Sequence, residues 1–142
     1  MTILEAIHDP ALFGPWFKKR DSWRAWGVFL AVLFGLPISE DDLELYRRHT
    51  GRSTPPTAAA REAWLVVGRR GGKSRIAALV AVYLACFRDY REHLAPGEVG
   101  TLPVIAADRK QARIVFKYIN GFLDGVPMLK ALVVNRTKES KH

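Results

Sequence analysis

The first third of the chain has the hydrophobic pattern of amphipathic helices. A helix over 21–36 would carry large apolar residues along one face, at three- and four-residue spacing: Trp23, Trp26, Leu30 and Leu33. Ser39 is expected to cap a second helix, with Asp42 as the acid of a capping box. Gly51 is expected to close that helix. The acidic residues 40–42 are explained by helix-start electrostatics rather than by a metal site.

The pattern changes after a loop. Pro55 and Pro56 exclude both helix and central strand, so residues 50–62 are predicted to form this loop. Three short apolar runs beyond it are predicted to be buried strands: 64–67, 102–107 and 131–134. Helices are expected between them, one over 74–90 and one that begins after Asp108 as its N-cap.

The order strand–helix–strand–helix–strand is typical of parallel α/β architecture with right-handed crossovers. We therefore expect an α/β fold, an incomplete parallel sheet of the P-loop NTPase type preceded by an N-terminal helical segment. The expected organisation is a single partial domain over 1–142. It would consist of a helical lead-in (1–49), the loop (50–62) and a βαβαβ unit (63–142).

Charge separates the two parts of the chain. The protein has 142 residues, 49% hydrophobic and 25% charged, which is a globular composition, and its formal net charge is +8. Residues 1–63 hold eight basic and eight acidic residues, whereas residues 64–142 hold fourteen basic and six acidic ones. Because like charges repel, this excess favours an anionic partner: a nucleotide, DNA or an acidic segment. A merely soluble basic surface is the other interpretation.

The sequence also predicts the cellular compartment and the state of the single cysteine. The first ten residues lack the basic and apolar regions of a signal peptide. The longest apolar runs, 25–38 and 76–87, are shorter than the roughly 18 residues that a membrane span needs. We expect a soluble, cytoplasmic protein with Cys86 as a buried, reduced thiol. The four histidines have no metal-ligand spacing.

The most specific feature is the run Gly71-Gly72-Lys73-Ser74, between a predicted strand and a predicted helix. In a P-loop, backbone N–H groups of such a turn and the helix N-terminus surround phosphate oxygens. Lys73 would reach the β- and γ-phosphates, and the Ser74 hydroxyl would bind Mg²⁺. The usual pattern has glycine where this chain has Val67, and Gly68 stands one place later. A basic turn between two buried elements is the alternative.

The run VVGRRGGKSRIAA (66–78) resembles the variant Walker A motif of phage terminase large subunits, the ATP-driven motors that package viral DNA. The resemblance extends to both sides and covers nearly the whole chain. It includes FKKRDSWRAWGVFLAVLFGLPI, YRRHTGR, VIAADRKQARIVFKYI and RTKES.

This resemblance implies ATP and Mg²⁺ as cofactors, with a phosphate loop built from Gly68, Arg69, Arg70, Gly71, Gly72, Lys73 and Ser74. Lys73 would contact the phosphates, Ser74 would hold magnesium through ATP, and Arg69 or Arg70 would stabilise charge during phosphoryl transfer or bind phosphate statically. The loop HTGRSTPP (49–56) would contact adenine or be an ordinary solvent turn.

The implied partners are double-stranded phage DNA, a terminase small subunit and a portal protein, with homo-oligomers possible and no membrane, in the cytoplasm of a bacterial host. The family pattern continues with a Walker B strand ending in Asp-Glu and, later, a nuclease domain. This chain stops at KESKH, and Asp89, Asp108 and Asp124 stand in other contexts. The resemblance thus implies an N-terminal piece of the ATPase, with negligible turnover alone because metal- and water-positioning carboxylates are missing.

Two alternatives stay open. One is a helicase-like P-loop ATPase fragment. The other is a basic DNA-binding module without nucleotide chemistry. Its phosphate contacts would come from the basic face of the helix after Asp108: Arg109, Lys110, Arg113 and Lys117. Its stacking platforms would be Trp16, Phe17, Trp23 and Trp26, although helical spacing explains these aromatic residues more simply as core. The opposite, apolar face of the same helix would be Ala112, Val115, Ile119, Phe122 and Leu123.

Overall fold

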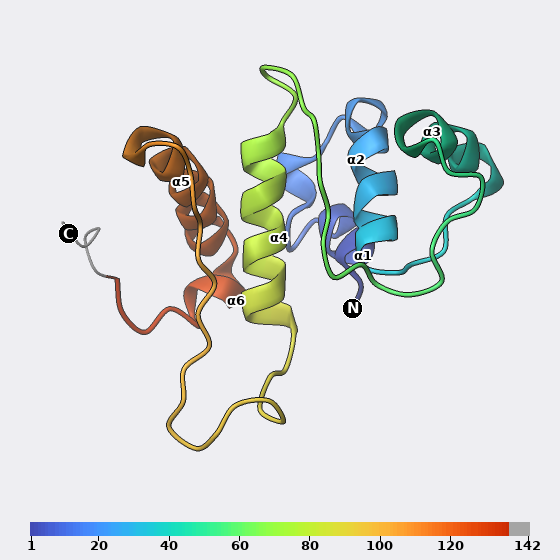
Figure 1. The fold of residues 1–142 in the computed structure, drawn as a ribbon. Coiled ribbons are helices and arrows are strands. Elements are labelled where there is room, and N and C mark those ends of the chain that lie inside the picture. The colour runs from blue at the N-terminus through green and yellow to red at the C-terminus, as the bar shows by residue number, and fades with distance from the viewer. Residues whose placement is uncertain (137–142) are drawn as a thin grey trace. The chain divides into compact units, whose positions relative to one another are not determined.

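The computed structural model describes residues 1–136, and in these residues the chain is helical and contains no strand (Figure 1). The helices are α1 (Ile3–His8), the 3₁₀ turn η1 (Gly14–Trp16), α2 (Arg20–Leu33), α3 (Glu40–Thr50), α4 (Lys73–Phe87), α5 (Arg109–Gly125) and α6 (Pro127–Lys130). The chain divides into two compact units, Met1–Arg69 and Arg70–His142, and each is described by itself. Most of the RTKES similarity lies outside the described residues.

The expected α/β fold with a parallel sheet is wrong, because the described residues are all helical. The segments predicted as strands, 64–67, 102–107 and 131–134, carry no strand structure. None of their apolar side chains is buried, and one residue in each run is almost fully exposed: Val66, Ile105 and Val134 are 107%, 91% and 98% exposed. A strand exists only through pairing with a neighbour, and a short apolar run does not specify that neighbour.

The first unit is organised around α2. A capping box starts α1, in which the N–H of Glu5 donates to the Thr2 hydroxyl and the Thr2 N–H donates to the Glu5 carboxylate. α1 packs against α2, and α2 packs against α3. The core between them contains Ile3, Phe13 and Leu30, each fully buried. The predicted apolar stripe of α2 is therefore partly confirmed: Leu30 is buried, while Trp23, Trp26 and Leu33 are half-buried.

The ends of α3 lie where the sequence places them, but one capping role differs. The Ser39 hydroxyl accepts the N–H of Asp42 at 3.3 Å, and Gly51 closes the helix in the left-handed region with φ 69°. The Asp42 carboxylate instead accepts a hydrogen bond from Arg24 Nε at 2.8 Å. The expected capping-box acid is thus an ion-pair partner that joins α3 to α2.

The end of α2 is held by a close backbone approach. Gly35 follows the helix with φ 67°, and an added Cβ would lie 2.5 Å from the backbone nitrogen of Ala59. The N–H of Ala60 donates to the carbonyl of Leu33 at 2.9 Å. The loop predicted over 50–62 therefore returns to the C-terminal end of α2, and only glycine fits at that contact.

The second unit consists of α4, α5 and α6, with α5 packed against both other helices (Figure 1). Asp108 is the N-cap of α5 as expected, since its carboxylate accepts the N–H of Gln111 at 2.8 Å. Phe122 of α5 and Leu129 of α6 are buried, as is Leu79 of α4. Within residues 1–136, no helix combines the length and the apolar character that a bilayer-crossing helix requires.

Candidate phosphate-binding loop

The loop that precedes α4 has an unusual backbone. Arg70 has φ 59°, Gly72 has φ 83°, and Gly71 between them does not have a positive φ. α4 then begins at Lys73, with Gly72 as its N-cap. Turns with left-handed residues of this kind can direct successive N–H groups toward one side and so provide an anion-binding concavity. The glycine at 72 is needed here because a Cβ disfavours this region.

The N-terminus of α4 lacks the two groups that usually stabilise a helix start, a capping side chain and an acidic residue in the first turn. Gly72 provides no side chain to cap the helix, and the first turn contains no acidic residue. The other long helices differ: α2 and α3 have acids in their first turns, and α5 has Asp108 as its N-cap. The first turn of α4 instead carries the cations Lys73 and Arg75. Because cations are unfavourable at the positive end of a helix dipole, this helix start is suited to an anion.

Backbone donors are available at the same place. The first N–H groups of a helix have no acceptor within the helix. For Lys73 and Ser74, the part of the chain that the structure describes supplies no other acceptor. Lys73 is exposed and Ser74 is half-buried. Two N–H donors, an ammonium group and a hydroxyl therefore lie within two successive residues at one helix end.

The structure brings together part of the predicted site. Arg70, Gly71, Gly72, Lys73 and Ser74 form one turn and the start of one helix in the second unit. Gly68 and Arg69 end the first unit, directly before that turn, and both are exposed.

Acidic residues that could complete a magnesium site are not gathered in the described residues, which contain no cluster of three or more metal-ligating side chains. The carboxylate of Asp89 binds Arg91, and this ion pair lowers the pKa of Asp89 to about 2. Asp124 pairs with Arg136 at 2.7 Å, which lowers the pKa of Asp124. Ser74 is the residue of the loop whose hydroxyl suits Mg²⁺, an ion that usually also keeps waters and phosphate oxygens as ligands.

Comparison with known proteins identifies no relative of this chain. No family model matches the chain, and no curated protein or solved structure is significantly similar to it. The terminase resemblance therefore depends on the motif residues themselves.

The basic face of α5 lies where the helical pattern predicted it. Its four basic residues are exposed: Arg109, Lys110, Arg113 and Lys117. The opposite face is half-buried, with Phe122 fully buried against the rest of the unit. The aromatic residues suggested as stacking platforms behave differently, since Phe17 is 4% exposed and packs edge-to-face on Trp23 at 4.9 Å between ring centroids. This packing favours their role as core.

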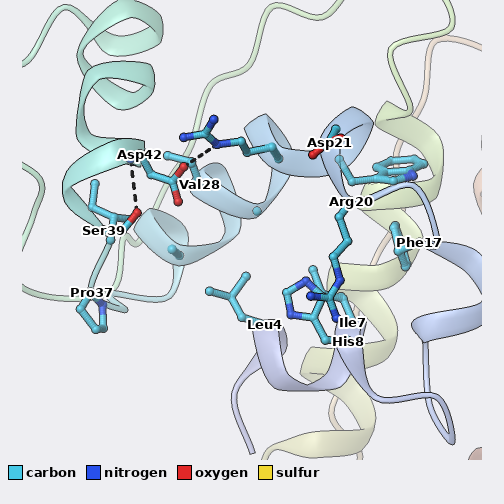
Figure 2. A pocket seen from close by; sticks show the side chains of 15 residues that line it. Leu4, Ile7, His8, Phe17, Arg20, Asp21, Val28, Pro37, Ser39 and Asp42 are labelled. Carbon is cyan, nitrogen blue, oxygen red and sulfur yellow. Dashed lines mark hydrogen bonds and ion pairs between the residues drawn. The ribbon is translucent and has the colours of Figure 1, made fainter.

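Sequence reasoning missed a pocket in the first unit (Figure 2). It has a volume of about 260 Å³, is partly open to solvent, and lies between α1, α2 and the segment that leads into α3. Its lining includes His8, Arg20 and Gly27. The only signal in the sequence was a glycine in the middle of an otherwise apolar helix, which is costly there and suggests a packing or functional reason.

Proposed function

We propose that this chain binds ATP with Mg²⁺ through the loop Arg70–Ser74, as the ATP-binding segment of a motor of the phage terminase large-subunit type. The observation that carries the proposal is the loop backbone: two positive φ angles around Gly71 lead into a helix start with N–H donors and no acid. The Walker-like sequence GRRGGKS is the second support.

Each group has a separate role in this proposal. The N–H groups of Lys73 and Ser74, at the start of α4, would contact phosphate oxygens. The Lys73 ammonium would neutralise charge on the β- and γ-phosphates, and the Ser74 hydroxyl would be one magnesium ligand. Arg69 and Arg70 would bind or stabilise the same phosphates. DNA packaging, with double-stranded DNA, a small subunit and a portal as partners, belongs to the proposal as the activity of a larger assembly.

The test is calorimetric titration with a non-hydrolysable ATP analogue and Mg²⁺. Lys73→Ala is expected to weaken binding by about tenfold or more, because it removes a charge-assisted contact. Lys130→Ala removes the same charge from the same unit and is the matched control, expected to keep the wild-type affinity. Equal losses in the two variants would mean that general basicity, not the loop, attracts the nucleotide.

A second candidate function, polyanion binding by α5, is favoured by its exposed basic face. Four cations on one helix side would track a phosphate backbone without reading its sequence. Lys117→Ala is expected to weaken binding to double-stranded DNA and to reduce the slope of log affinity against log salt by about one. An affinity that hardly changes with salt would exclude this function.

A further inference from the structure

The pocket of the first unit is apolar on its floor and charged at its rim. Ile7 of α1 and Val28 of α2 are 5% and 7% exposed and form part of the floor. At one end Arg24 is paired with Asp42 at 2.8 Å, and its Nη2 also donates to the carbonyl of Asp41 at 3.1 Å. The polar groups at that end are therefore already satisfied by α3.

Gly27 opens the middle of the pocket. It lies inside α2, where glycine lowers helix stability relative to alanine. It also lines the pocket, and an added Cβ would have no atom within 4 Å. An alanine would therefore fit without a clash and would strengthen the helix. Because residue 27 has no Cβ, a bound molecule has space to approach the backbone of α2.

The other end of the pocket carries the Arg20 guanidinium and the His8 imidazole. The Arg20 side chain extends beside His8 of α1 (Figure 2). Across residues 1–136, no carboxylate lies within ion-pairing distance of Arg20. The neighbouring acid, Asp21, also lines the pocket. The hydrogen bond to Asp42, and to a smaller extent the charges of Asp41 and Asp21, raise the pKa of the Arg24 guanidinium. A guanidinium and an imidazole thus lie together at the edge of an apolar floor, and among the described residues no carboxylate is paired with the guanidinium.

We propose that this pocket binds a small organic carboxylate with an apolar, aromatic-sized body. Its carboxylate would be held by Arg20 and His8, and its body would cover Gly27. The volume of about 260 Å³ is slightly below the roughly 300 to 1,000 Å³ of most ligand pockets, so it suits a small molecule and not a nucleotide. Planar guanidinium groups suit carboxylates because two N–H donors can bind both oxygens. All residues that line this pocket belong to the first unit, and the proposal does not rest on ATP binding.

The test is an NMR titration of the whole chain with 3-phenylpropanoate, with 3-phenylpropanamide as the neutral analogue. We expect saturable shifts of the His8 and Gly27 amides with the acid, and binding at least about tenfold weaker with the amide. Arg20→Gln is expected to lower the affinity for 3-phenylpropanoate to that of the wild-type chain for 3-phenylpropanamide.

Two glycine variants separate binding from folding. Gly27→Ala is expected to raise the melting temperature by about 2 to 4 °C and yet abolish binding. Gly121→Ala is the matched control, because Gly121 also lies inside a helix with open space around its Cβ position. It is expected to raise the melting temperature without changing affinity. Non-saturating shifts, equal affinities for acid and amide, or wild-type binding by Gly27→Ala would each overturn the proposal.

Discussion

The guanidinium carbon of Arg75 lies 5.5 Å from the centroid of the Tyr118 ring. This cation–π contact connects the first turn of α4 to the middle of α5, directly beside the candidate loop. Tyr118→Leu keeps an apolar side chain but removes the ring face. We expect the free energy of unfolding to fall by about 0.5 to 1 kcal/mol in urea titrations. Tyr90→Leu, in the loop after α4, is the control and should cost less. Equal losses would mean that the contact contributes nothing specific.

Two glycines with similar φ angles should respond differently to alanine. At Gly51 the strain of φ 69° is the only penalty, because an added Cβ meets nothing within 4 Å, so Gly51→Ala should cost about 1 kcal/mol. At Gly35 the same strain is joined by a clash at 2.5 Å with the backbone of Ala59. Gly35→Ala should therefore cost about 2 kcal/mol or more. Chemical denaturation measures both, and equal losses would contradict the close approach at Gly35.

His8 makes the stability of the first unit depend on pH. Burial, and secondarily the charge of Arg20, lower the pKa of His8 below its ordinary value of 6.5. The unfolded chain therefore binds this proton more readily than the folded chain does. The stabilising contribution is complete above about pH 6.5 and is lost as the pH falls through the lowered pKa.

His8→Gln should flatten the dependence of unfolding free energy on pH below 6.5, as measured by urea titrations at several pH values. Asp21, Arg24 and Asp42 also line the same pocket and are kept constant in this comparison. His93→Gln, in the second unit, removes a histidine elsewhere in the chain and is the matched control. A slope that His8→Gln does not alter would contradict a lowered pKa of His8 in the folded chain.

A substitution at Arg70 can separate effects on stability from effects on phosphate affinity. Its φ of 59° is unfavourable for a residue with a Cβ by roughly 1 kcal/mol, a cost that glycine avoids. Arg70→Gly should therefore leave the melting temperature unchanged or higher. If the guanidinium binds phosphate, the affinity for the ATP analogue should fall by about tenfold. A stable variant with unchanged affinity would assign Arg70 to the turn alone.

The parts of the fold that the sequence predicted correctly are local. Ser39, Gly51 and Asp108 act within a few residues of themselves, so their capping roles are visible in the sequence. The expected strands failed because pairing depends on distant residues, and the apolar runs 64–67 and 102–107 have no such partner in the part that the structure describes. The glycine turn before α4 was likewise local and predictable.

The pocket could not be predicted for the same reason as the strands. His8 and Arg20 are twelve positions apart and lie together only because α1 packs against α2. The sequence indicates that Asp42 is a capping-box acid in an acidic helix start. The packing of α3 on α2 instead makes it the ion-pair partner of Arg24.

The central claim, that phosphate binds at the turn before α4, is tested most directly by NMR. Backbone amide shifts would be recorded while a non-hydrolysable ATP analogue and Mg²⁺ are added to the whole chain. The account predicts saturable shifts that are largest for Gly71, Gly72, Lys73 and Ser74, and that disappear in Lys73→Ala. Shifts centred on Arg109 to Lys117, or spread evenly over the basic residues, would contradict it.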